Sequence, residues 1–112
     1  MEAGIPRELA PGVTTTVYTG DQAMISIVRF APGGKGKLHH HPEEQWGFCL
    51  EGSGKRTQGD LTVEIAKGDF WRTPGDLPHT MEAGPSGLVV IDVFAPPRKA
   101  YETAGSGFGD GS

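Results

Sequence analysis

The sequence predicts an all-β fold in which short antiparallel strands wind into a small barrel. The 112 residues include 18 glycines and 9 prolines, a composition that favours frequent tight turns. No segment sustains the apolar periodicity of a helix, whereas short β-branched runs recur, each closed by turn residues. The length argues for one domain with its own hydrophobic core.

About eight strands are expected in chain order. They cover residues 13–19, 24–31, 37–41, 45–51, 61–66, 70–73, 79–83 and 88–94. Turn residues separate them at Gly20-Asp21, at Pro32-Gly33-Gly34, at Gly68-Asp69 and at Pro74-Gly75-Asp76. Residues 52–57 (GSGKRT) fail the phosphate-loop pattern and are interpreted as a hairpin turn. The spacing between turns is typical of sandwiches and jelly rolls.

The chain divides into three expected parts. Residues 1–12 are interpreted as an N-terminal arm or edge strand, and residues 13–101 as the barrel domain. Residues 102–112 are rich in Gly and Ser and are expected to form a flexible tail. We find no internal repeat and no second domain in this reading.

Charge and composition exclude several classes of function. The net charge is −4 and no basic block is present, so no nucleic-acid partner is expected. No apolar run reaches the length of a membrane span, and no secretory signal opens the chain. The single cysteine precludes an intrachain disulfide. Together these observations predict a cytoplasmic protein with no membrane partner.

Residues 38–45 (LHHHPEEQ) contain the clearest chemical signal. Side chains alternate between the two faces of a strand, so His39 and His41 would point to one side and His40 to the other. Two imidazoles converging on one point are typical of a metal site. Gln45 could add its amide oxygen from the following strand, and imidazole with carbonyl oxygen suits a mid-row divalent ion.

His79 is the remaining histidine, and it follows the stretch TPGDLP. Two prolines restrict that turn, so the side chain after it would be held in a defined place. A third imidazole ligand is the interpretation we favour for His79. The competing interpretation of the histidine triplet is a polar loop, and for His40 that interpretation is preferred.

These residues resemble the cupin family, whose two short motifs surround a metal in a small barrel. The first motif has the spacing G-x5-H-x-H-x3-E-x6-G, and the second G-x5-P-x-G-x2-H-x3-N. The first is matched at Gly33, His39, His41, Gln45 and Gly52, and the second at Gly68, Pro74, Asp76 and His79. The resemblance spans Leu9 to Tyr101 and implies a jelly-roll β-barrel with one divalent metal.

Two positions depart from the motifs. Gln45 replaces the glutamate ligand, and Ala83 stands in place of the asparagine. Three neutral imidazoles and an amide would leave a divalent ion its full charge, which favours a Lewis-acid role over a redox role. The ligand set is compatible with nickel, iron, manganese or zinc and selects none of them.

The stretch DVFAPPR, residues 92–98, narrows the resemblance to the small pectin-degradation cupins, which linearise unsaturated uronates. That resemblance implies Asp92 and Arg98 as catalytic groups and Phe94 as a substrate-binding residue. By strand parity Asp92 shares a face with Leu88 and Phe94, so an interior carboxylate could act as general acid or base. Arg98 could bind a substrate carboxylate or form a surface ion pair, and Phe94 could be plain core.

The expected function is a metal-dependent, non-redox isomerase or ring-opening enzyme acting on a small carboxylated sugar acid. Two alternatives remain: an Fe(II)-dependent dioxygenase, and a non-catalytic small-molecule-binding module. A homodimer is expected, because barrels of this size often pair through an edge strand. Cys49 is interpreted as core, and Trp46 and Trp71 as packing or interface residues.

Overall fold

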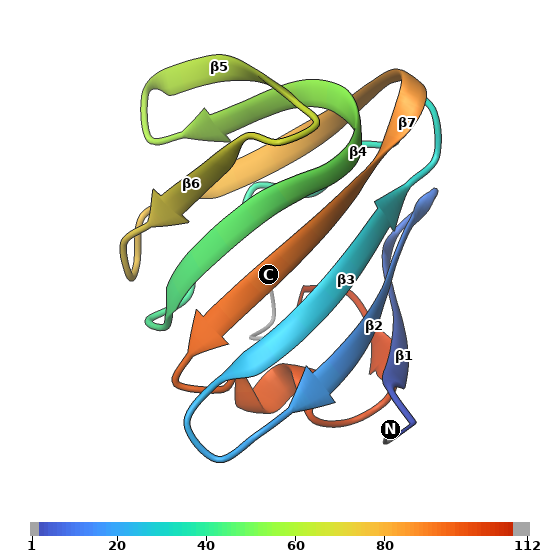
Figure 1. The fold of residues 1–112 in the computed structure, drawn as a ribbon. Coiled ribbons are helices and arrows are strands. Elements are labelled where there is room, and N and C mark those ends of the chain that lie inside the picture. The colour runs from blue at the N-terminus through green and yellow to red at the C-terminus, as the bar shows by residue number, and fades with distance from the viewer. Residues whose placement is uncertain (1–2, 109–112) are drawn as a thin grey trace.

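The computed structural model describes residues 3–108 and is built almost entirely of strands (Figure 1). Eight strands and one short 3₁₀ helix follow in the order β1 (Ile5–Ala10), β2 (Val13–Thr19), β3 (Met24–Phe30), β4 (Glu44–Gln58), β5 (Leu61–Ala66), β6 (Phe70–Thr73), β7 (His79–Ala95), η1 (Lys99–Tyr101) and β8 (Gly105–Ser106). They form one sheet in the order β5-β4-β7-β3-β2-β1-β8, with β6 also paired to β4. All pairings are antiparallel except that between β1 and β8. The all-β prediction is confirmed, although the curled sheet does not close.

Two strands are longer than predicted. Residues 52–54, interpreted as a hairpin turn, lie inside β4, and the runs 79–83 and 88–94 belong to one continuous β7. The β4–β7 register shifts twice, between Cys49 and Glu51 and between Gly52 and Gly54. Gly52 has φ 82°, and a side chain there would overlap the backbone carbonyl of Gly87. The glycines therefore mark bulges within paired strands.

Residues 37–41 do not form the predicted strand. They make a single isolated bridge to β7, which joins His39 to His79. The His39 amide donates to the His79 carbonyl at 3.1 Å, and the His79 amide donates back to the His39 carbonyl at 2.9 Å. This one pair is enough to place the two histidines opposite each other.

The two ends of the described chain are tied together. β8 pairs with β1, and the Gly107 amide donates to the Glu8 carbonyl at 2.8 Å. The Arg7 guanidinium donates to four carbonyls of the C-terminal segment, an arrangement we call the Arg7 clasp; the acceptors belong to Ala100, Thr103, Ser106 and Gly107. The segment predicted as a flexible tail is therefore paired and bonded as far as residue 108. Residues 109–112 lie outside the described part.

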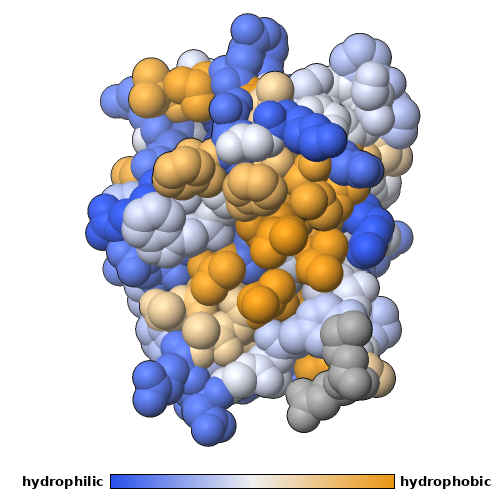
Figure 2. Space-filling view, viewed as in Figure 1, coloured by the Kyte–Doolittle hydropathy of each residue, from blue (hydrophilic) through white to orange (hydrophobic). Residues whose placement is uncertain are grey.

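Opposite faces of the sheet differ in what they contact. The inner face carries the core, including Val13, Val17, Val90 and Phe94, all at most 2% exposed. The outer face of β3, β7 and β4 is also apolar, and it fills the centre of the surface in Figure 2. Its most exposed members are Ile25, Trp46, Phe48 and Leu50, at 39–45%. We call this surface the outer apolar face.

Candidate metal centre

Three histidines converge inside the curled sheet. One ring nitrogen from each of His39, His41 and His79 lies within 4.8 Å of the others. All three residues are at most 9% exposed. His79 begins β7, His39 is bridged to it, and His41 follows two residues later on the segment leading into β4. His40, between them, is exposed, as its parity predicts.

Each imidazole is oriented by a backbone carbonyl two residues away. The Nδ1 atoms of His39, His41 and His79 lie 2.7, 3.0 and 2.8 Å from the carbonyls of Lys37, Glu43 and Leu77. A carbonyl only accepts, so each Nδ1 carries the proton. In the neutral rings each Nε2 then keeps its lone pair for a ligand, which is the second-shell arrangement typical of metal-binding histidines.

The ring nitrogens of His41 and His79 that face the centre meet no protein hydrogen-bond donor among residues 3–108. The Nε2 of His41 lies 3.0 Å from the Oε1 of Gln45, and both atoms accept once Nδ1 holds the ring proton. The Nε2 of His79 is buried and has no hydrogen-bond partner among residues 3–108. Lone pairs brought together in a buried space are stabilised by a shared cation. The three histidines therefore fit one divalent metal ion, and Gln45 is placed to supply a fourth ligand atom.

The turn before His79 is braced against the segment that carries His41. The Asp76 amide donates to the His41 carbonyl at 2.7 Å. Asp76 has φ 64°, a left-handed conformation that glycine adopts more readily. This explains why the motif expects glycine at this position, and the short polar side chain of aspartate tolerates it. Both halves of the ligand set are thus bonded to each other through the backbone.

Burial keeps the His41 and His79 rings neutral. Desolvation, which disfavours the imidazolium, lowers the pKa of His79 from 6.5 to about 3. Burial, followed by the positive charge of Arg98, also lowers the pKa of His41. Neutral imidazole is the form that binds metal. The protein thus presents His41 and His79 in their ligating state over the physiological pH range.

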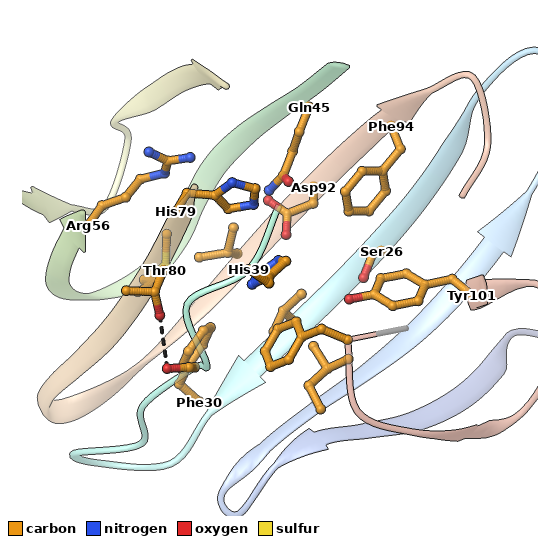
Figure 3. Close-up of a pocket in the computed structure, with 16 residues that line it drawn as sticks. Ser26, Phe30, His39, Gln45, Arg56, His79, Thr80, Asp92, Phe94 and Tyr101 are labelled. Atoms are coloured by element: carbon orange, nitrogen blue, oxygen red, sulfur yellow. Dashed lines mark hydrogen bonds between the residues drawn. The ribbon is translucent and has the colours of Figure 1, made fainter. Parts of the chain in front are cut away.

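Asp92 lies on β7 opposite Gly47 of β4. It lines a buried cavity together with His39, His79 and Gln45. Its Oδ1 is buried and has no hydrogen-bond partner in the described chain. Burial raises its pKa from 3.8 to about 6, while the Gln45 amide and the charge of Arg56 act in the opposite direction. The Gln45 amide group thus contacts the His41 ring and also stabilises the ionised form of Asp92. Figure 3 shows Gln45, Asp92 and His79 directed toward one another.

Phe94 and Arg98 occupy different surroundings. Phe94 is 2% exposed, lines the cavity and meets the His41 ring edge-on at 5.4 Å. Arg98 does not line this cavity but an adjacent open cleft of about 680 Å³, which His41 also borders. Its guanidinium donates to the Phe108 carbonyl, packs 4.2 Å from the Tyr101 ring centroid and lies 3.9 Å from the Glu43 carboxylate.

Two cavity residues were missed in the sequence. Arg56 is 3% exposed and lines the cavity from β4. The register shift between Cys49 and Glu51 adds one residue to β4 and reverses its alternation, so that Gln45 and Arg56 both face inward although one position is odd and the other even. Phe108 is 6% exposed, lines the cavity and stacks on His39 with ring centroids 4.3 Å apart. A Gly-rich context gave no signal that its side chain would be buried.

The cavity and its ligand set define a class of protein, namely a small β-sheet protein with a buried three-histidine metal site. The cavity measures about 50 Å³, room for a few water-sized groups. Within residues 3–108 no helix is long and apolar enough to cross a membrane.

Comparisons with known proteins place this class in a family. The Cupin_2 model, a cupin domain, matches residues 26–94. The chain is 37% identical over 85 residues to the dimethylsulfoniopropionate lyase DddW of Ruegeria pomeroyi, covering 71% of this chain and 56% of that protein. It is 32% identical over 72 residues to the oxalate decarboxylase OxdC of Bacillus subtilis, covering 60% and 19%. The chain thus spans only part of either relative.

A solved structure has the same fold. KdgF from Halomonas sp. superimposes with a TM-score of 0.78 over 88% of this chain and 96% of that one, at 23% identity, which supports the fold alone. With the match to the Cupin_2 model, this chain belongs to the cupin family. The jelly-roll fold and the divalent metal site expected from the sequence are confirmed at that level.

Proposed function

We propose that this cupin is a metal-dependent enzyme that opens or isomerises a small carboxylated sugar acid, of the unsaturated uronate type, without redox change. The observation that carries the proposal is the buried Asp92 oxygen beside the three-histidine site. A carboxyl group in this position can take or deliver a proton at a substrate bound in the cavity. A bound divalent ion would polarise a substrate oxygen as a Lewis acid.

Other residues around the cavity have proposed roles of their own. The Gln45 amide connects the ligand set to Asp92 and holds the carboxyl in place. Phe94 forms the apolar wall beside His41 and keeps water away from the proton transfer. Arg98, predicted as a carboxylate clamp, lies along the adjacent cleft, so its role stays a prediction for a substrate that reaches that side. A soluble, cytoplasmic homodimer is part of the same proposal.

The relatives support the chemistry in a limited way. Oxalate and dimethylsulfoniopropionate, the compounds named for the two curated relatives, each carry a carboxylate. A small carboxylated substrate is consistent with both names. The neighbour KdgF shares the fold, and the DVFAPPR stretch is the sequence feature that favours uronate over the other acids.

The test is turnover of an unsaturated uronate monosaccharide by metal-loaded protein, followed by loss of the absorbance of its ring double bond. Asp92→Asn should lower turnover by about 10²- to 10⁴-fold with metal content unchanged, because the amide cannot carry the proton. Asp60→Asn, in the exposed turn after β4, is the matched control. Oxygen consumption by the Fe(II)-loaded protein would favour the dioxygenase. Ligand binding without turnover would favour the binding module.

A further inference from the structure

We propose that Arg56 is the group that binds the anionic end of the substrate inside the cavity. This inference rests on the proposed function only in taking the substrate to be a small carboxylate. It assigns to Arg56 a role that sequence patterns had given to Arg98.

The first observation is a buried charge that has no carboxylate in contact with it. Arg56 is 3% exposed and remains protonated at neutral pH, since burial lowers its pKa only to about 10. No carboxylate of residues 3–108 lies at ion-pairing distance from it. Its hydrogen bonds go to neutral oxygens, those of the Gln58 amide and the Thr73 hydroxyl. Asp92 acts on Arg56 through its charge but makes no ion-pair contact with it. An anion bound in contact with the guanidinium would therefore stabilise the buried cation further.

The second observation is position. Arg56 lines the cavity together with His39, His79, Gln45 and Asp92, and Figure 3 shows its guanidinium directed toward His79. Its positive charge acts on both His79 and Asp92. An anion bound by Arg56 would therefore lie beside the ligand set and next to the carboxyl group proposed to move the proton.

The third observation is that the guanidinium is held before any ligand arrives. Thr73 is fully buried and accepts one of its hydrogen bonds, Gln58 accepts another, and the Trp71 ring lies 5.4 Å away. These two hydrogen bonds fix the plane of the guanidinium group, and N–H donors remain for a further acceptor. Such preorganisation lowers the entropy cost of binding a planar carboxylate.

Three of the other four arginines are engaged differently. Arg72 pairs with the Glu44 carboxylate at 2.5 Å, Arg7 donates to four carbonyls, and Arg98 is near Glu43. None of these three lines the cavity. The cavity of about 50 Å³ admits a carboxylate and few other atoms. The part of a substrate that fits the cavity as it stands is its carboxylate end.

The experiment is a titration of Zn²⁺-loaded protein with acetate and with acetamide, its neutral isostere, followed by the NMR signal of the Trp71 indole N–H. Arg56→Gln should weaken acetate binding roughly tenfold or more, because a charge-assisted hydrogen bond is lost, and leave acetamide binding unchanged. Arg72→Gln, on the neighbouring strand, is the matched control and should bind acetate like the wild type. Metal content is measured for every variant.

An Arg56→Gln protein that binds acetate as tightly as the wild type would overturn the inference. Loss of acetate binding in Arg98→Gln, while Arg56→Gln binds normally, would also overturn it. Should Arg56→Gln fail to fold or to hold zinc, the wild-type Arg56 Nε–H signal decides. A shift with acetate and none with acetamide supports the role, and no shift at saturation overturns it. Acetate binding through Arg56 in a protein that turns over no uronate would overturn the proposed function alone.

Discussion

At the scale of single residues, His39, His41 and His79 differ from His40 in burial and in the carbonyl each Nδ1 contacts. The sequence predicts this division because strand parity separates adjacent positions even where the backbone forms only one bridge. This division decides which histidines can bind the metal. Three rings are held inside the sheet with Nδ1 directed at a carbonyl, and the fourth is left in solvent.

Replacing one inner ring should therefore remove the metal, while replacing the outer one should not. His79→Ala leaves two imidazoles and a weak amide donor, so metal content after purification should fall well below one ion per chain. His40→Ala should retain it. Elemental analysis by plasma mass spectrometry of both untagged proteins is the measurement. Equal metal in the two variants would remove His79 from the ligand set.

The buried rings also make the metal-free protein sensitive to acid. The folded-state pKa of His79, about 3, is below its ordinary value of 6.5, so the unfolded chain binds the proton more readily. Stability from this group is complete above pH 6.5 and falls as the pH drops toward 3, by about 1.4 kcal/mol per pH unit. The lowered pKa of His41 adds in the same direction.

Urea unfolding of chelator-treated protein at pH 7.5, 6 and 4.5 checks this slope. His79→Phe, which cannot titrate, should show a flatter dependence than the wild type. A wild type whose free energy of unfolding is the same at all three pH values would contradict the buried, neutral state of the ring.

At the scale of elements, packing between β4, β6 and β7 decides where the cavity groups lie. Gly47 is opposite both Asp92 and Trp71, and a methyl group on Gly47 would overlap the Trp71 indole. Glycine is needed there for close approach of a ring, not for a turn.

Gly47→Ala should accordingly displace Trp71 and lower the melting temperature, since overpacking typically costs about 1–3 kcal/mol. Gly36→Ala is the control, because there the nearest heavy atom would be 3.4 Å from the new carbon. Thermal unfolding followed by tryptophan fluorescence measures both. A Gly47→Ala protein as stable as Gly36→Ala would show that the indole has room to move.

The elements also show what could be predicted from the sequence. Most of the expected strands, the H-x-H parity and the turn-held His79 follow from local patterns and are found in the structure, whereas the strand expected at residues 37–41 is not. Arg56 could not be placed, because the bulge between Cys49 and Glu51 reverses the alternation of β4 and is defined only by pairing with β7. Phe108 could not be placed either, since its segment is held by Arg98 and by Arg7, which lies 100 residues from Gly107 along the chain.

At the scale of the whole molecule, the outer apolar face is the feature that a monomer leaves unexplained. Cross-strand pairs Ile27–Ile91 and Ile25–Val93, with Phe48 and Trp46 beyond them, form two apolar rows over β3, β7 and β4. Contiguous exposed apolar surface of this kind favours association. Pairing of two copies through this face would satisfy the predicted homodimer without an edge strand.

Phe48→Glu should then yield a monomer, because a carboxylate would be desolvated at the centre of the contact. Leu61→Glu, on β5 and 65% exposed in the wild type, should leave the oligomer intact. Sedimentation velocity of the three proteins distinguishes them. A monomeric wild type would contradict the dimer outright.

The C-terminal segment completes the wall of the metal cavity through Phe108. Phe108→Ala removes the ring that stacks on His39, so water and chelator should reach the ion sooner. The expected result is faster zinc transfer to excess chelator with unchanged stoichiometry. Phe70→Ala, at a phenylalanine that is 71% exposed, is the control. Equal transfer rates would show that the ion leaves by another route.

The position of Phe108 in this wall depends on the Arg7 clasp. Arg7 is not a ligand, yet its four carbonyl bonds fix the segment that holds Phe108 in place. If Phe108→Ala speeds zinc transfer as expected, the histidines set the equilibrium affinity, whereas Phe108 and Arg7 set the residence time of the ion. Selection could therefore alter how long this protein keeps its metal without altering how tightly it binds it.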